Sequence, residues 1–248
     1  MQTPVSLVVS GEEISSGEQM ASADQAQAAG TELLHAEPAR VEMPAAADVV
    51  ASALSPGAGA TSEPAPLKTL QELSREAADC RLCTLAETRT SVVFGVGDPQ
   101  ADLVLIGEAP GRDEDLRGEP FVGRAGQLLD RMLQAIGLDR KRVYIMNTIK
   151  CRPPNNRDPK PDEVQACNLW FEQQLNMLQP KMICLLGRVA AQTVLETDAS
   201  LGSLRGRWHD YRGVPTWVTY HPAYLLRSPQ QKKKSWQDML VLSNRLRG

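Results

Sequence analysis

The fold is decided by residues 103–126, which read LVLIGEAPGRDEDLRGEPFVGRAG. The stretch begins with an apolar run without alternation at residues 103–106, which is typical of a strand buried on both faces. The glycines and proline of residues 107–111 then let the backbone turn sharply and approach a ligand closely. Open α/β sheets place their binding sites in such loops. The glycine spacing matches neither the dinucleotide-binding fingerprint nor the phosphate loop that ends in Gly-Lys-Ser/Thr.

Strands and helices alternate along the rest of the chain. Apolar runs predict strands over residues 91–96, 103–106, 143–146, 182–186 and 215–219. Apolar periodicity and end signals predict helices from residue 67 toward Cys80 and over residues 126–136, 161–178, 187–195 and 232–246. This order predicts an α/β fold with a mainly parallel sheet and helices on both faces. We expect the last helix to bury one broad face, made of Trp236, Met239, Leu240, Leu242 and Leu246.

The first 66 residues differ in composition from the rest. They hold nine acidic residues and one basic residue, are rich in Ala, Ser, Gly and Pro, and have no aromatic residue. Such a segment buries too little apolar surface to offset its ordering entropy. We therefore expect a disordered tail over 1–66, with a transient helix at 44–54, and a folded domain over 67–248. The tail is either a solvated segment or a binding site for an unidentified partner.

The folded part carries a net charge of +5 behind the acidic tail, which suits a polyanionic partner. Residues 1–20 lack a basic start and a long apolar core, so they do not resemble a secretory signal. No apolar run reaches the roughly 20 residues that span a membrane. We expect a cytoplasmic protein that does not enter membranes.

The cysteines form a second pattern. Cys80 and Cys83 make a C-x-x-C pair, and Cys151 and Cys167 have fifteen residues between them. In a reducing compartment, four thiolates can hold a zinc ion or a [4Fe–4S] cluster. Each could instead be a small buried apolar side chain. Cys184 lies inside the predicted strand 182–186, so we expect it in the core.

Polar side chains follow three of the predicted strands. Glu108, Asn147 and His221 each stand at a strand end, so the topology would bring them to the same sheet edge. The amide of Asn147 offers both an acceptor and a donor, which can recognise a flat ligand such as a pyrimidine. Phe121 offers an aromatic face for stacking. His209, which we expect in a loop, and His35, in the tail, carry no such pattern.

Taken together, GEAPGRDEDLRGEPFVGRAG, Asn147, KCRPPNNRDPKP, HPAYLLR and the four cysteines resemble the family 4 uracil-DNA glycosylases. The resemblance covers residues 67–248. It implies a three-layer α/β/α sandwich with a short, mainly parallel central sheet, a [4Fe–4S] cluster, and hydrolysis of the N-glycosidic bond of deoxyuridine in DNA. It implies a monofunctional glycosylase, which leaves an abasic site and so initiates base excision repair. We expect a monomer acting on uracil-containing DNA.

The resemblance also implies roles for individual residues. Glu108 and Ala109 would line the uracil pocket, Phe121 would stack on the base, Asn147 would bond its Watson–Crick edge and His221 its O2 oxygen. The catalytic group would comprise His221, Glu108 and Asn147. Leu225 and Leu226 would fill the gap left by the extruded base, with Arg227 near a phosphate. Cys80, Cys83, Cys151 and Cys167 would hold the cluster.

The chain departs from related families at two points. Some of them carry an aspartate that positions the attacking water where this chain has Ala109. Glu108, Glu114 or Asp115 could take part, or stabilisation of the leaving group could suffice, which we favour. Some iron–sulfur relatives trap their product through a histidine in the loop after the third cysteine. Residues 152–160 contain no histidine, so we expect turnover without trapping.

Two other functions fit parts of the sequence. A non-catalytic iron–sulfur DNA-binding module would use the cluster and the lysines 232–234, but Glu108, Asn147 and His221 argue against it. A zinc-stapled hydrolase of free nucleotides would not need the HPAYLLR wedge. A polymerase is excluded by the chain length and by the lack of an evident two-metal arrangement.

Overall fold

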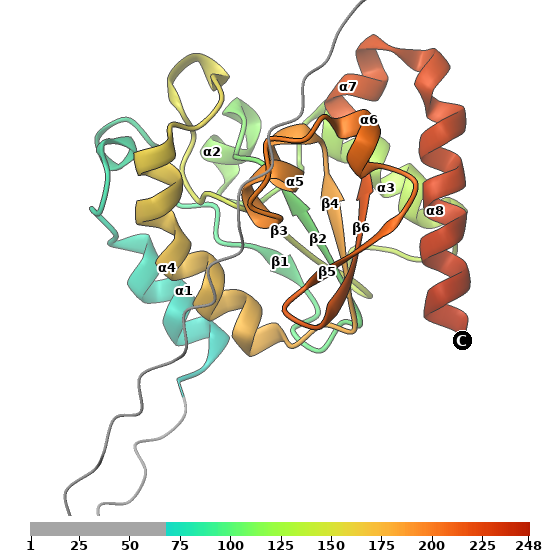
Figure 1. Cartoon of the computed structure of the whole chain (residues 1–248). Helices are drawn as coiled ribbons and strands as arrows, with labels where there is room; N and C mark the ends of the chain where they lie inside the picture. Colours follow the sequence, from blue (N-terminus) through green and yellow to red (C-terminus); the bar gives the residue numbers. More distant parts are fainter. Residues whose placement is uncertain (1–67) are drawn as a thin grey trace, which may run out of the picture. The chain divides into compact units, whose positions relative to one another are not determined.

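The computed structural model describes residues 68–248, which form a six-stranded sheet between two layers of helices (Figure 1). The strand order is β1-β3-β2-β4-β6-β5. The four central strands run parallel, and β1 and β5 pair antiparallel at the two edges. The predicted start at Leu67 and the predicted tail over 1–66 lie outside the described residues. In residues 68–248, no helix is long and apolar enough to cross a membrane.

The elements follow one another as strands and crossover helices. The strands are β1 (Val96–Gly97), β2 (Leu103–Gly107), β3 (Tyr144–Asn147), β4 (Met182–Leu186), β5 (Trp208–Tyr211) and β6 (Val214–Thr219). The helices are α1 (Leu70–Ala78), α2 (Arg112–Arg117), α3 (Arg124–Ala135), α4 (Pro161–Leu178), α5 (Arg188–Val194), α6 (Leu201–Leu204), α7 (Pro222–Arg227) and α8 (Lys232–Arg247). Short 3₁₀ turns lie at Thr84–Glu87, Pro154–Asn156 and Pro229–Gln231.

Each face of the sheet is covered by its own set of helices. Alternate residues of the central strands point to opposite faces. Val104 and Ile106 pack with Phe171 and Leu175 of α4, together with α5 and α6. Leu103 and Leu105 face the other way and pack with α3 and α8. The predicted three-layer α/β/α sandwich is confirmed.

Most predicted elements agree with the structure within two residues, and the prediction of Cys184 as a core residue is confirmed by its full burial in β4. The predicted strand over 91–96 is wrong, because only β1 at its end pairs with the sheet. The amides of Thr90 and Ser91 instead donate to the Asp115 carboxylate at 2.8 and 3.3 Å, and the amide of Val93 donates to the Lys150 carbonyl at 2.8 Å.

Two further expectations need correction. Met239 and Leu242 of α8 are buried, but Trp236 and Leu240 are each 41% exposed. The buried face turns toward Asp238, whose carboxylate accepts a hydrogen bond from Thr219 at 2.6 Å and pairs with Arg205 at 2.8 Å. His209 lies in β5, not in a loop, and its Nε2 contacts the Leu204 carbonyl at 2.6 Å. Helices α2, α6 and α7 and strand β5 were not predicted.

Candidate active site

The carboxyl ends of three parallel strands border one cleft of about 440 Å³. Glu108 follows β2, Asn147 ends β3, and His221 follows β6 by two residues. All three line this strand-end cleft, together with Ala109 and Phe121. The structure thus brings together the predicted pocket residues, as expected for the carboxyl edge of a parallel sheet.

Gly107 allows this close assembly. It pairs with Asn147 across the β2–β3 ladder. A Cβ at this position would lie 2.4 Å from Asn147 Oδ1 and 2.6 Å from the tip of the Phe121 ring. Only glycine leaves room for the amide and the ring to occupy the same end of the cleft.

Phe121 forms one wall of the cleft. Its side chain is 5% exposed, and its ring centroid lies 5.5 Å from that of His221 at an interplanar angle of 31°. Its φ is +56°, a left-handed conformation that is strained for an aromatic residue. Such strain persists only where the surroundings hold it, so the neighbouring contacts set the position of the ring.

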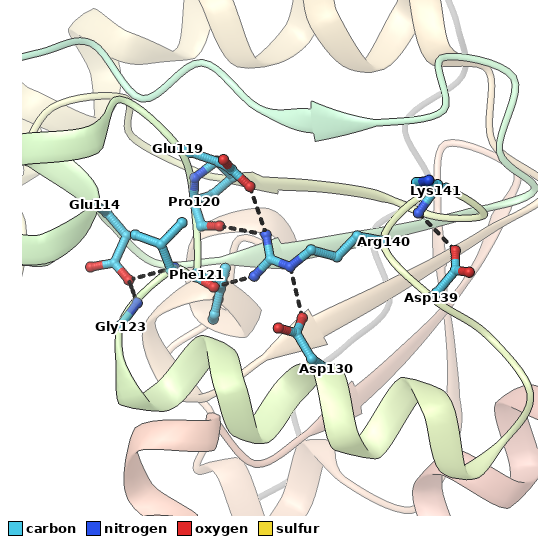
Figure 2. Close-up of polar contacts among 10 residues, drawn as sticks. Glu114, Glu119, Pro120, Phe121, Gly123, Asp130, Asp139, Arg140 and Lys141 are labelled. Carbon is cyan, nitrogen blue, oxygen red and sulfur yellow. Dashed lines mark hydrogen bonds and ion pairs between the residues drawn. The ribbon is translucent and has the colours of Figure 1, made fainter.

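Arg140, in the loop after α3, provides much of that hold (Figure 2). Its guanidinium donates to the Phe121 carbonyl and, at 3.0 Å, to the Pro120 carbonyl. The same group pairs with Asp130 of α3 at 2.7 Å and with Glu119 at 3.2 Å. Sequence reasoning missed Arg140, because nothing local marks a loop arginine nineteen residues away as a partner of Phe121.

The carboxylates of Glu114 and Asp115 both accept hydrogen bonds from backbone amides. Glu114 Oε1 accepts hydrogen bonds from the amides of Val122 and Gly123, each at 3.0 Å, as Figure 2 shows. Asp115 is 3% exposed and caps the segment at Thr90 and Ser91. Glu114 borders the strand-end cleft and Asp115 is not among its lining residues. Asp115 is therefore placed to hold the fold, and Glu114 holds the loop after Phe121.

Asn147 presents an unused polar group to the cleft. Its side chain is 1% exposed, and within residues 68–248 its Oδ1 is a buried atom without a hydrogen-bond partner. Leaving a buried acceptor unsatisfied costs about 1–3 kcal/mol. Such a group at a cleft wall fits a ligand that supplies the missing N–H.

His221 is held as a neutral donor. Its Nδ1 accepts a hydrogen bond from the Ala223 amide at 3.1 Å, at the start of α7. Burial and then the nearby Arg227 charge lower the His221 pKa to about 4. At neutral pH the ring is therefore uncharged with its proton on Nε2, since Nδ1 is the acceptor.

Glu108 contributes a carboxyl group that is a weaker acid than an ordinary glutamate. Burial first, and the charge of Asp158 second, raise its pKa to about 7, against an opposing effect of Arg188. Its backbone carbonyl accepts from the Thr148 hydroxyl at 2.7 Å and from the Ile149 amide at 3.2 Å. Raised carboxyl pKa values in clefts are typical of functional sites.

Helix α7 carries the predicted DNA-contacting residues, with one correction. Leu225 is 1% exposed and packs inside the protein, so it does not project as a wedge. Leu226 is partly exposed and Arg227 is exposed and lines the cleft. Tyr224, which sequence reasoning missed, is 36% exposed at the cleft and stacks on Tyr220 at 5.2 Å. The sequence analysis gave no signal for Tyr224, because helix α7, which carries it, was not predicted.

The four predicted ligand cysteines line a second, apolar cavity, which we call the cysteine cavity. Three of the sulfurs receive N–H groups: Cys80 from Trp170 Nε1 at 3.1 Å, Cys167 from the Lys150 amide at 3.3 Å, and Cys151 from Arg89 at 3.6 Å. Burial raises the pKa of Cys151 to about 12 and raises that of Cys167. As free thiols, both would therefore stay protonated at neutral pH.

This donor set fits an iron–sulfur cluster. Four sulfurs around one cavity, with N–H groups directed at them, are the ligands and outer contacts that such clusters use. Within residues 68–248 no group of three or more metal-binding side chains surrounds the position of a single ion. A four-iron cluster is larger than one ion, so its ligands stand further apart.

The Pro-rich loop after Cys151 forms another wall of the strand-end cleft, through Pro153, Asn156, Arg157 and Asp158. Arg157 is fixed by two bonds to Glu163, at 2.8 and 2.6 Å. Asp158 pairs with Arg188 at 2.7 Å. The sequence analysis used this loop for the family resemblance and noted its lack of histidine, but it did not predict that the loop lies at the cleft.

Comparisons with known proteins agree with this geometry. A model of the uracil DNA glycosylase superfamily matches residues 94–240. A type-4 uracil-DNA glycosylase of Archaeoglobus fulgidus is 44% identical over 69% of this chain and 90% of its own length. Those of Sulfurisphaera tokodaii and Thermotoga maritima are each 40% identical, over 69% and 64% of this chain and 82% and 84% of their own. The matched residues 94–240 include the lining of the strand-end cleft, together with Cys151 and Cys167 of the cysteine cavity. The chain belongs to the type-4 family of the uracil-DNA glycosylase superfamily.

Proposed function

We propose that this protein hydrolyses the N-glycosidic bond of deoxyuridine in DNA, releasing uracil and leaving an abasic site that initiates base excision repair. The observation that carries the proposal is the unpartnered, buried Oδ1 of Asn147, which lies beside the Phe121 ring in a cleft that a flat base can enter. A type-4 relationship to proteins named as uracil-DNA glycosylases supports it.

The proposed recognition of uracil uses three walls of the cleft. The Phe121 ring would stack on the base. Asn147 Oδ1 would accept the N3–H of uracil, and its amide nitrogen would donate to O4. Cytosine lacks this N3–H and carries an amino group in place of O4, so it would leave the same amide unsatisfied and be disfavoured.

The chemistry proposed for His221 follows from its tautomer. Cleavage leaves the electron pair of the N1–C1′ bond on uracil, as negative charge shared with O2. A neutral Nε2–H fixed in position would stabilise this charge without transferring its proton. Water then forms the new bond to C1′ and releases a proton. Backbone groups of Glu108 and Ala109 complete the proposed wall around the leaving base.

The attacking water needs no strong base in this proposal. Asp115 and Glu114 both accept backbone hydrogen bonds. The third candidate carboxyl group, Glu108, borders the cleft, and its pKa is raised to about 7. We propose that its ionised form favours the positively charged sugar, while stabilisation of the leaving group remains the main effect.

On the DNA side, we propose that Leu226 enters the gap left by the extruded base and that Arg227 contacts a phosphate. Leu225 supports the helix from within, since it is buried. The exposed lysines Lys232, Lys233 and Lys234 at the start of α8 would add phosphate contacts.

We propose that Cys80, Cys83, Cys151 and Cys167 hold a [4Fe–4S] cluster. When bound, it cross-links the segment after α1, the Pro-rich loop and α4. We assign the cluster a structural role, because its ligands line a cavity other than the strand-end cleft.

The test is a strand-cleavage assay without added metal. The purified full chain is mixed with a labelled oligonucleotide carrying one uracil, and alkali then cuts abasic sites. Matched thymine and cytosine oligonucleotides and the Asn147→Ala variant are the controls. We expect cutting at uracil alone, with turnover and no covalent adduct in a denaturing gel. DNA binding without cutting would instead favour a non-catalytic DNA-binding module.

We further propose that the catalytic domain spans residues 67–248, that it acts as a monomer, and that residues 1–66 are dispensable for excision. A chain beginning at residue 67 should match the full chain in single-turnover rate and sediment as a monomer. A slower truncated chain would assign the first 66 residues a part in the reaction.

A further inference from the structure

Lys150 is a fully buried cation that the proposed reaction does not use. Among the residues that the structure describes, it is one of the largest with less than 2% exposure. None of the ion pairs among residues 68–248 includes it. Buried lysines are rare unless a partner offsets the loss of hydration, so the surroundings must supply a compensating charge.

The contacts of the ammonium group are neutral. Nζ donates to the Asn147 carbonyl at 2.9 Å and to Gln174 Oε1 at 2.5 Å. The Gln174 amide nitrogen donates to the Phe94 carbonyl and to the Tyr144 hydroxyl, each at 3.0 Å, which orients its oxygen toward Lys150. The Phe94 and Phe171 rings lie 5.7 and 5.9 Å from Nζ. These groups hold an ammonium well, but none carries a formal negative charge.

A source of negative charge beside Lys150 is the cysteine cavity. Its one lining carboxylate, Glu163, is already paired with Arg157, which leaves the cysteines. Lys150 lines that cavity, precedes Cys151 in the chain, and donates its backbone N–H to Cys167 Sγ at 3.3 Å. Ligand cysteines are thiolates, and a cluster held by four thiolates has a net negative charge. Arg89 approaches the same cavity, but its guanidinium also bonds the Ala78 and Cys80 carbonyls and is partly exposed. Lys150 is the cation on the interior side.

We propose that Lys150 is the buried counter-cation of the thiolate-held cluster, and that its bond to the Asn147 carbonyl ties the cysteine cavity to the strand-end cleft. Residues 147–151 then form one strut, with the base-recognising amide at one end and a cluster ligand at the other. Lys150 acts on Asn147 as a positioning residue, since it lines the cysteine cavity and is absent from the lining of the cleft.

The first test measures the cluster, not excision. In Lys150→Met of the full chain, iron and acid-labile sulfide per chain should fall, and a chelator should bleach the visible absorbance several-fold faster. The reduction potential should become more negative, because removing a nearby positive charge disfavours the more negative reduced state. The control is Lys181→Met, which removes the same charge from an exposed residue before β4 and should leave these values unchanged.

A second variant, Gln174→Glu, tests the same proposal if Lys150→Met does not fold. Gln174→Glu keeps the side-chain shape and places a carboxylate beside Nζ, which would compete with the thiolates for the ammonium. We expect the potential to shift in the same negative direction with the fold retained. Unchanged potential and bleaching rate in Gln174→Glu, or in folded Lys150→Met, would overturn the proposal. Wild-type protein without iron would overturn it together with the cluster assignment.

The link to the strand-end cleft rests on the proposed function and is tested separately. At equal iron content, Lys150→Met should excise uracil several-fold more slowly in single turnover, while Lys181→Met matches the wild type. Equal rates for Lys150→Met and wild type would remove the coupling to Asn147. Wild-type protein that does not excise uracil would instead contradict the proposed function, and the cluster measurements would still stand.

Discussion

The strand-end cleft and the cysteine cavity approach each other along the chain at Asn147 and Cys151, which are four residues apart, but they differ in construction. The cleft is large, and Asn147 Oδ1 is left without a partner in it. The cysteine cavity is apolar, and three of its sulfurs already receive N–H groups. A site for a ligand that enters and leaves keeps unsatisfied groups, whereas a site for a permanent group has its outer contacts completed.

This difference predicts that substitutions in the two regions will separate in their effects. Changes in the cleft should affect excision while leaving iron content and stability nearly intact. Changes in the cysteine cavity should affect iron content and stability first, and excision only as a consequence.

The largest effect is expected in the cysteine cavity. Cys83→Ser removes one proposed ligand of the cluster and should abolish stable iron binding and lower the melting temperature by many degrees. The matched control is Cys184→Ala, a core cysteine in β4, which should keep its iron while losing some stability. Iron analysis and thermal unfolding measure both. Equal iron in Cys83→Ser and wild type would exclude Cys83 as a ligand.

Asn147→Ala should give the largest loss confined to the cleft. Removing both hydrogen bonds to the base should lower kcat/KM roughly a thousandfold, which is about 4 kcal/mol of transition-state stabilisation. Iron content and melting temperature should be retained. Asn168→Ala, at an exposed position of α4, is the control. Loss of iron from Asn147→Ala would contradict the prediction that changes in the cleft leave the cysteine cavity intact.

His221→Ala should lower the single-turnover rate about a hundredfold with little change in DNA affinity, because in the proposed mechanism the Nε2–H stabilises the leaving base and does not contact the duplex. His209→Gln in β5 should excise at the wild-type rate. Binding and single-turnover measurements on the same oligonucleotide separate the two effects. A loss limited to DNA binding would disprove the donor role.

Arg140→Lys should lower kcat about tenfold with a smaller change in KM. Lysine keeps a charge near Asp130 and Glu119 but cannot span the Pro120 and Phe121 carbonyls with one planar group. The strained Phe121 ring would then be less well fixed. Arg142→Lys, whose guanidinium bonds the Gly137 carbonyl, is the matched control. Identical kinetics in the two variants would argue against a role for Arg140 in fixing the position of Phe121.

Glu108→Gln should have the smallest effect, visible as a change in pH dependence. The pKa of Glu108 in the folded protein is near 7, above the ordinary value of 4.5, so the folded state favours the protonated carboxyl group. The free energy of unfolding therefore falls as the pH rises from about 4.5 through 7. The variant should be roughly 1 kcal/mol more stable than wild type at pH 8 and equal to it near pH 4. The wild-type excision rate should rise through pH 7, and that of the variant should stay flat. Asp162→Asn, at an exposed site, serves as control.

Much of this organisation was predictable from local pattern. The burial of Leu103–Gly107 on both faces, the helix at Pro161–Leu178 and the strand at Met182–Leu186 follow from apolar runs and helix-start signals. The strand-end positions of Glu108, Asn147 and His221 followed from the alternation of strands and helices, since parallel strands bring their carboxyl ends together.

The incorrect predictions share one cause. In each case, contacts with residues far along the chain outweighed the preference of the local sequence. Residues 91–96 did not extend as a strand because the Asp115 carboxylate took the amides at its start. The face of α8 turned toward Asp238 because Thr219 and Arg205 bind it. Leu225 was expected to project toward DNA, but it packs into the core.

The sequence by itself determined the order of strands and helices, the residue types at the strand ends and the four thiol groups, because each depends on neighbours within a few positions. Only the tertiary structure decided that Arg140 holds the strained Phe121, that His221 carries its proton on Nε2, and that Lys150 lies between the cysteine cavity and Asn147. These depend on distances between segments that meet only after the chain has folded, and no local pattern encodes such a distance.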